Sequence, residues 1–181
     1  MTVSTIIEGC RRGRADCQRE LVVRYSPQLM AVARRYAPNN ATAKDVLQDS
    51  LVRILQKIDQ YAGTGSFEGW MRRVVISVAL KQLDRKWVRR EVSVGEQRDH
   101  QSVAPVALDQ LATEDIMRCI SGLPDGYRQV FNLYAIEGYN HREIAQMIGV
   151  SESTSRSQYN RARKSLQTIL TDLKIALKHA E

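Results

Sequence analysis

The sequence contains little of what metal sites, disulfide frameworks or membrane spans require. Its 181 residues include three cysteines and three histidines, and the cysteines are not spaced as metal ligands. Cys10, Cys17 and Cys119 are an odd number, so we expect them to be buried as small hydrophobic side chains in a reducing cytosol. No stretch approaches the ~20 apolar residues of a membrane span, and the N-terminal MTVSTIIEGCRRG lacks the apolar core of a signal peptide. The sequence therefore predicts a cytoplasmic protein that holds no metal and no cofactor.

Residues that could perform catalysis are also sparse. His100, His141 and His179 lie far apart in the sequence, and no cluster of carboxylates or histidines has the spacing of a metal-dependent nuclease. An enzyme that acts on nucleic acid or on a small-molecule substrate is therefore not indicated. What the chain does have is positive charge, because 27 Lys and Arg residues outnumber 20 Asp and Glu residues for a net charge of +7. This excess favours a polyanionic partner, although a soluble basic protein without one could have the same composition.

Hydrophobic periodicity predicts helices throughout, whereas the alternating pattern of strands is nearly absent. The expected helices span residues 16–37 as a pair bent around Pro27, then 42–58, 67–87, 109–121, 127–137 and a final two-helix motif that ends near residue 178. Residues 91–108, EVSVGEQRDHQSVAPVAL, have no period and contain glycine and proline, which indicates a linker. The predicted fold is all-α, with two small helical domains, residues 8–90 and 109–178, joined by a flexible linker.

The stretch HREIAQMIGVSESTSRSQYNRAR, residues 141–163, has the pattern of a helix-turn-helix. Ala145 is small where the two helices would cross, Gly149 suits the turn between them, and Ser151 is a suitable N-cap for the second helix. In such motifs the N-terminal end of the second helix enters the major groove. The side chains expected to face DNA are Ser153, Thr154, Ser155, Arg156, Gln158, Arg161 and Arg163. A solvated basic helix within a helical bundle is the alternative interpretation.

Ser155 departs from the usual pattern of this motif. The position commonly holds an aliphatic residue that packs into the core between the two helices. Tyr159 follows one helical turn later, and we expect its ring to supply that packing instead.

The segment SFEGWMRRVVISVALKQLDRK, residues 66–86, combines an aromatic residue with basic and hydroxyl side chains. Helical spacing places them along one stripe: Trp70, Arg73, Ser77, Lys81 and Arg85. A stacking ring beside positive charge is what single-stranded nucleic acid requires. The alternative for Trp70 is a place in the hydrophobic core, and the tryptophan by itself favours that alternative.

The segment DVLQDSLVRIL, residues 45–55, has a different character. Leu47, Leu51, Ile54 and Ile58 are expected on the buried face of its helix. The other side carries Asp45, Gln48, Asp49 and Val52. An acidic face does not seek DNA, so it either faces water or docks a protein. The residues alone favour water.

Taken together, these segments resemble a bacterial RNA polymerase sigma factor of the extracytoplasmic-function (ECF) group of the sigma-70 family. The resemblance rests on DVLQDSLVRIL and SFEGWMRRV, followed after the linker by LPDGYRQVFNLYAIEGYNHREIAQMIGVSESTSRSQYNRARKSL, and it covers about residues 8–175. It implies that residues 8–90 dock core polymerase and melt the minus-ten promoter element. It implies further that residues 91–108 thread toward the RNA exit path, and that residues 109–178 read the minus-thirty-five element.

The resemblance also assigns roles to individual residues. Asp45, Gln48, Asp49 and Val52 would bind core polymerase, which reverses the preference for water on that face. The minus-ten element would be bound by Tyr61, Thr64, Ser66, Phe67, Trp70, Arg73, Ser77 and Lys81. The helix-turn-helix residues given above would contact the minus-thirty-five element. The expected function is transcription initiation without catalysis. Core RNA polymerase and promoter DNA are the expected partners, and an anti-sigma factor is a third candidate. The rival is a conventional dimeric helix-turn-helix regulator that binds duplex DNA without polymerase.

Overall fold

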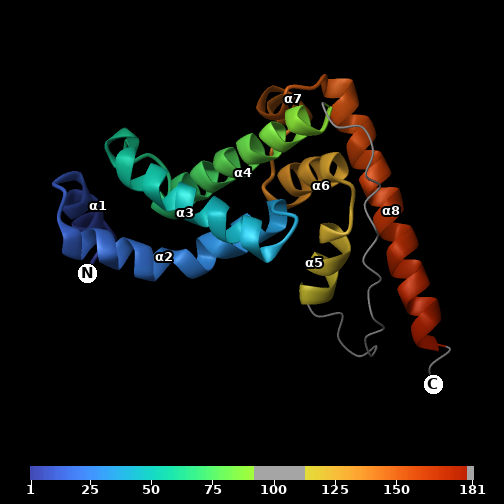
Figure 1. Ribbon diagram of the computed structural model, residues 1–181, viewed down its shortest axis with the longest axis horizontal. Helices are drawn as coiled ribbons and strands as arrows, with labels where there is room; N and C mark the ends of the chain where they lie inside the picture. The colour runs from blue at the N-terminus through green and yellow to red at the C-terminus, as the bar shows by residue number, and fades with distance from the viewer. Residues whose placement is uncertain (92–112, 179–181) are drawn as a thin grey trace. The chain divides into compact units, whose positions relative to one another are not determined.

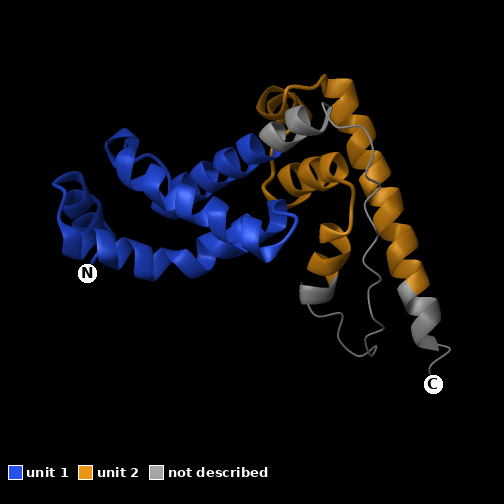
Figure 2. Cartoon of the chain, viewed as in Figure 1, with its two compact units in different colours: residues 1–93 blue, residues 94–181 orange. Residues whose placement is uncertain are grey.

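The computed structural model describes residues 1–91 and 113–178, and its regular elements there are all helical (Figure 1). The side chains of residues 84–91, 113–115 and 173–178 lie outside the description. The chain divides into two compact units, residues 1–93 and 94–181 (Figure 2). The predicted all-α fold is confirmed. Of the predicted linker, Glu91 is the last residue of a helix, and residues 92–108 lie outside the described residues.

Unit 1 consists of α1 (Val3–Arg11), α2 (Ala15–Tyr36), α3 (Asn40–Gln56), a short 3₁₀ turn η1 (Ile58–Gln60) and α4 (Phe67–Glu91). The helices α2, α3 and α4 pack against one another, and α1 packs on α2. Their contacts bury large apolar side chains that include Leu21, Tyr36, Val46, Ile54, Met71 and Ile76. Because each helix contributes one apolar face, the opposite faces of α3 and α4 remain available to bind other molecules.

Pro27 lies inside α2, which is a single helix of 22 residues rather than the predicted pair. Proline removes one backbone hydrogen bond and costs a helix interior about 3 kcal/mol. Here its ring is on the exposed side of the helix, while Leu21, Tyr25 and Leu29 form a buried row that continues past it. Packing of that continuous apolar face stabilises the helix on both sides of the proline, and this is why the prediction of two helices was wrong.

The buried face of α3 is also rotated from the predicted one. Ala43, Val46, Ser50 and Ile54 are fully buried, whereas Leu47 and Leu51 are half-buried. Ser50 can occupy the core because its hydroxyl donates a 2.6 Å hydrogen bond to the carbonyl of Val46, one turn earlier in the same helix.

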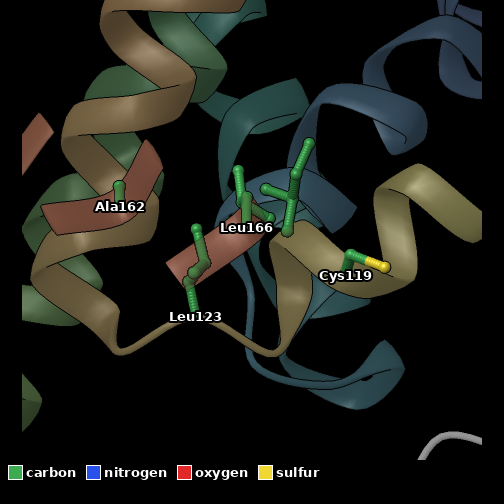
Figure 3. Packing of buried hydrophobic residues seen from close by; sticks show 5 residues of the cluster. Cys119, Leu123, Ala162 and Leu166 are labelled. Carbon is green, nitrogen blue, oxygen red and sulfur yellow. The ribbon is translucent and has the colours of Figure 1, made fainter. Parts of the chain in front are cut away.

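Unit 2 consists of α5 (Thr113–Ser121), α6 (Asp125–Phe131), a π-helical turn η2 (Asn132–Ile136), α7 (His141–Ile148) and α8 (Glu152–Lys178). The expected start of α5, residues 109–112, lies outside the described residues. The expected helix 127–137 is divided, since its second half is the wider π turn. Figure 3 shows Cys119 and Leu123 near Ala162 and Leu166, and these four residues with Ile120 form a buried cluster between α5 and α8. Residues 122–124 form the turn that joins α5 to α6.

All three cysteines are free and buried, as predicted. Cys17 lies against Gly9 of α1, because a Cβ added to that glycine would come within 2.1 Å of the Cys17 Sγ atom. Burial raises the pKa of the Cys10 thiol, and nearby Cys17 and Asp16 raise it further. None of the described helices combines the length and the apolar character that crossing a membrane would require.

Candidate functional site

The exposed face of α3 carries the predicted polymerase-binding residues together. Asp45, Gln48, Asp49 and Val52 are all exposed, and Val52 keeps 50% of its accessible surface. Their spacing of three or four residues places them on one side of the helix, with acidic groups and an amide around an apolar side chain. Such a mixture of an apolar centre and charged surroundings is typical of a protein-binding surface.

Gln82 of α4 adds a contact to this face that sequence reasoning missed. Its Nε2 donates a 2.8 Å hydrogen bond to Oδ2 of Asp49. The bond joins Asp49 to α4, and Asp49 stays exposed to solvent. The two residues are 33 positions apart, so no helical spacing could have indicated the contact.

The loop between η1 and α4 has two glycines in the left-handed region, with φ of 76° at Gly63 and 75° at Gly65. Side chains other than glycine rarely adopt this conformation. The hydroxyl of Tyr61 donates a 2.8 Å hydrogen bond to the carbonyl of Gly65, which closes the loop on itself. Thr64 and Ser66 are exposed in the loop, and the Ser66 hydroxyl also accepts a hydrogen bond from the backbone of Gly69 at the start of α4.

Four aromatic rings cluster where this loop meets α4. Phe67 lies at the centre, with its ring centroid 5.9 Å from that of Tyr25, 5.2 Å from Tyr61 and 5.8 Å from Trp70. The Phe67 and Trp70 planes are 12° apart, so these two rings stack. Phe67 and Tyr61 are buried, at 2% and 8% exposure, whereas Trp70 is half-buried. Trp70 is therefore compatible both with a place in the core and with stacking on a base, since one part of its surface is packed and another part is accessible.

Phe67 must be removed from the predicted DNA-contacting residues, because its ring is enclosed by the other three. Tyr61 is mostly enclosed as well, and its described contacts hold the loop rather than face solvent. Beyond the cluster, the stripe on α4 is present, since Arg73, Ser77 and Lys81 are all exposed in line with Trp70. The side chain of Arg85 lies outside the described residues.

The helix-turn-helix has the predicted local geometry. Asn140 caps α7 through a capping box, in which its side chain accepts from the Glu143 N–H while the Glu143 side chain accepts from the Asn140 N–H. Gly149 ends α7 with φ of 70°, in the left-handed conformation expected of it. The Ser151 hydroxyl accepts a 3.0 Å hydrogen bond from the Thr154 N–H, which confirms the predicted N-cap of α8.

The exposed side of α8 carries a hydroxyl and three guanidinium groups, from Ser153, Arg156, Arg161 and Arg163. Arg156 pairs with Glu152 one turn earlier, but both side chains remain largely exposed, at 62% and 45%. An exposed pair of this kind is weak, so the arginine is free to exchange the carboxylate for another partner. Thr154 is half-buried, and its hydroxyl lies 2.8 Å from that of Ser151.

Ser155 cannot contact DNA in this structure, which corrects the prediction for that residue. Its side chain is fully buried, and its Oγ lies 3.0 Å from Nδ1 of His141 at the start of α7. Burial lowers the pKa of the His141 imidazole, and Arg156 lowers it further, which favours the neutral form of the ring. The hydroxyl thus has a partner at a position that commonly holds an aliphatic residue.

Tyr159 supplies packing at this point, as predicted. Its ring centroid lies 4.5 Å from that of Tyr134 and 5.9 Å from that of His141, while Tyr134 stacks on His141 at 4.4 Å. These rings come from the π turn, α7 and α8, and they form a partly exposed aromatic cluster in place of an aliphatic contact. No pattern in the sequence indicated that His141 and Tyr134 would take part.

Gln158 of α8 is half-buried. A Cβ added to Gly126 of α6 would come within 3.5 Å of its amide, and its Oε1 is buried without a hydrogen-bond partner among the described residues. Part of the Gln158 side chain therefore packs between α8 and α6, and its contact with DNA stays a prediction.

Comparison with known proteins gives a consistent family. Residues 21–89 match the family model of sigma-70 region 2, and residues 113–166 match that of sigma-70 region 4. The chain is 27% identical to the ECF RNA polymerase sigma factor SigE of Mycolicibacterium smegmatis over 83% of its own length and 60% of that protein. It is 24% identical to the ECF RNA polymerase sigma-E factor of Salmonella typhimurium, over 92% of this chain and 93% of the relative.

Among solved structures, the fold is similar to that of the sigma factor RpoE of Bartonella quintana, determined in complex with the anti-sigma factor NepR. The TM-score is 0.57 at 21% identity, over 84% of this chain and 96% of the other. The two family models together cover most of the chain, in the order that the sequence motifs predicted.

The chain belongs to the sigma-70 family of bacterial RNA polymerase sigma factors, in its ECF group. It is a transcription initiation factor that directs RNA polymerase to promoters, and sigma factors are transcription factors rather than enzymes. A helix-turn-helix regulator that acts without polymerase is not favoured, because that function would not explain why residues 21–89 match sigma-70 region 2.

Proposed function

We propose that unit 1 opens the promoter at the minus-ten element and holds a displaced base beside Trp70. One observation carries this proposal: Trp70 is half-buried on the stacked ring of Phe67, beside a glycine-bounded loop and in line with exposed Arg73. A ring that is supported on one side and accessible on another can stack on a base without first being ordered. The basic and hydroxyl groups along α4 would neutralise and bind the adjoining phosphates.

The residues proposed for this site are those that remain accessible. They are Thr64 and Ser66 in the loop and Trp70, Arg73, Ser77 and Lys81 on α4. Tyr61 and Phe67 act behind them, as support for the loop and for the Trp70 ring. The domain that carries this site is assigned to residues 8–90, and it also docks core polymerase through the exposed α3 face of Asp45, Gln48, Asp49 and Val52.

The second domain, residues 109–178, is proposed to read the minus-thirty-five element through the exposed side of α8. Ser153 and Arg156 lie on the first turns, where a recognition helix meets base edges, while Arg161 and Arg163 follow one or two turns later. Thr154 lies behind them, half-buried against Ser151.

We further propose that a proteinaceous anti-sigma factor holds this chain inactive in the cytoplasm. The support is the similarity of its fold to RpoE, which was crystallised with the anti-sigma factor NepR. A protein that covers the α3 face would compete with core polymerase. The purified chain should therefore bind either core polymerase or such a factor, but not both at once.

The opening role is tested by replacing Trp70. Trp70→Ala should reduce the permanganate reactivity of promoter thymines more than it reduces duplex binding by the holoenzyme, because base stacking contributes ~1–3 kcal/mol only once bases are exposed. Trp70→Phe keeps a ring on Phe67 and should retain much of the reactivity. Normal reactivity in Trp70→Ala, or loss of its folded state in a thermal melt, would return Trp70 to a purely structural role in the core.

A further inference from the structure

Arg11, the last residue of α1, reaches across unit 1 to the loop that precedes α4. Its Nη2 donates a 2.7 Å hydrogen bond to the backbone carbonyl of Tyr61, 50 residues later in the chain. Its Nε lies 3.9 Å from Oδ1 of Asp59 in η1. The guanidinium therefore contacts both ends of the segment 59–61, which immediately precedes the loop. Arg11 precedes the residues that match sigma-70 region 2, which begin at residue 21.

The Tyr61 carbonyl is a position from which the whole loop can be controlled. Tyr61 is the C-cap of η1, and its own N–H is bonded to the Ile58 carbonyl. Its hydroxyl bonds Gly65 at the far end of the loop, and its ring contacts Phe67 and Trp70. A rotation of the Tyr61 peptide would thus displace the loop and the support of the Trp70 ring together. The bond from Arg11 resists that rotation, and hydrogen bonds from charged donors are the stronger kind.

The helix that carries Arg11 is itself anchored. Ile6 and Cys10 are buried, and Gly9 allows α1 to approach Cys17 of α2 so closely that a methyl group at that position would collide with the thiol. The Arg11 side chain keeps 35% of its accessible surface, so it lies partly enclosed between α1 and η1 rather than extended into solvent. The next residue, Arg12, differs in both respects, since it is 71% exposed and pairs within α1 with Glu8.

We propose that Arg11 is a positioning residue for promoter opening, which acts through the Tyr61 carbonyl and does not touch DNA. It sets the shape of the Tyr61–Ser66 loop so that Thr64, Ser66 and Trp70 face the displaced base together. This inference rests on the proposed role of Trp70 and adds α1 to the machinery of opening, although α1 lies outside the residues that match the region 2 family model.

The experiment compares Arg11→Gln, Arg11→Lys and the matched control Arg12→Gln, each reconstituted with core polymerase as the full chain. Arg11→Gln should bind core and closed duplex promoter as the unchanged chain does, while permanganate reactivity in the minus-ten region falls about tenfold, the scale of one charged hydrogen bond. The lysine variant keeps a charged donor and should restore most of the reactivity. Arg12→Gln should be indistinguishable from the unchanged chain.

Salt dependence separates positioning from direct contact. Because Arg11 meets a carbonyl and not a phosphate, the dependence of promoter binding on salt should be the same in Arg11→Gln and in the unchanged chain. If the slope of the logarithm of the binding constant against the logarithm of the salt concentration were smaller by about one in Arg11→Gln, the proposal would be overturned in favour of a phosphate contact. Loss of holoenzyme formation, normal opening in Arg11→Gln, or failure of lysine to restore opening would each overturn it as well. If the Arg11→Gln holoenzyme opens the promoter normally but the Trp70→Ala holoenzyme does not, only the positioning role of Arg11 fails. If the Trp70→Ala holoenzyme opens the promoter normally, the proposed function fails.

Discussion

Replacement of Asp49 by arginine is expected to lower the affinity of the chain for core polymerase by about tenfold or more, while the fold remains intact. Asp49 is exposed on the α3 face beside Asp45 and Val52, so a reversed charge costs the isolated chain little. In a complex, the same reversal places like charges opposite each other if the partner surface is basic, and such juxtaposition costs several kcal/mol. The measurement is fluorescence anisotropy of the labelled chain titrated with purified core enzyme, together with a thermal melt.

The hydrogen bond from Gln82 provides the control for this variant. Asp49→Arg removes that bond as well as the charge, whereas Gln82→Ala removes the bond and leaves the carboxylate in place. If the α3 face docks polymerase directly, Gln82→Ala should bind core within about twofold of the unchanged chain, since a solvent-exposed hydrogen bond contributes little net free energy. Equal losses in the two variants would mean that the contact between α3 and α4 matters and the charge does not. Unchanged affinity in a folded Asp49→Arg chain would contradict docking through this face.

Arg156→Ala is expected to relax the sequence preference of the chain at one or two positions of the minus-thirty-five element. Arg156 lies on the exposed side of α8 near its N-terminus, and an arginine there can pair with the O6 and N7 of a guanine for ~1–3 kcal/mol of discrimination. Selection of promoters from a randomised library, with the reconstituted holoenzyme, would show the preference as a change in the recovered upstream motif.

Two neighbouring variants separate base reading from general attraction. Arg163→Ala should weaken all sequences alike and lower the salt dependence by about one phosphate, because a residue two turns along the helix lies nearer the backbone than the base edges. Glu152→Gln breaks the pair that occupies Arg156 and should leave the selected motif unchanged, with affinity equal or higher. If Arg156→Ala returned the same upstream motif as the unchanged chain, α8 would not be the helix that reads it.

The parts of the site that could be predicted from the sequence are those determined within one helical turn. Gly149 and Ser151 define where α7 ends and α8 begins, and each acts on backbone groups no more than four residues away. The exposed side of α3, with Asp45, Gln48, Asp49 and Val52, follows from the same short-range periodicity. For these elements a single sequence is sufficient, because the residues that determine the structure are neighbours in the chain.

The parts that could not be predicted depend on contacts between helices. Ser155 was expected at the DNA surface, but its hydroxyl meets His141 across a separation of 14 residues. Gln82 meets Asp49 across 33 residues, and Arg11 meets Tyr61 across 50. Whether a polar side chain faces solvent or a partner in a neighbouring helix depends on packing angles that no local pattern specifies. The continuous helix through Pro27 has the same origin, since its buried row of apolar residues offsets a local preference for a break.

Run-off transcription with purified core polymerase measures the central claim most directly. Core enzyme, the purified chain and fragmented genomic DNA are combined, and the transcripts are mapped to their start sites. We predict discrete transcripts that require both proteins, that begin at a fixed distance downstream of a shared two-part motif, and that disappear with Asp49→Arg. The contradictory result would be a chain that binds duplex DNA tightly without core polymerase and adds no discrete transcript when core is present.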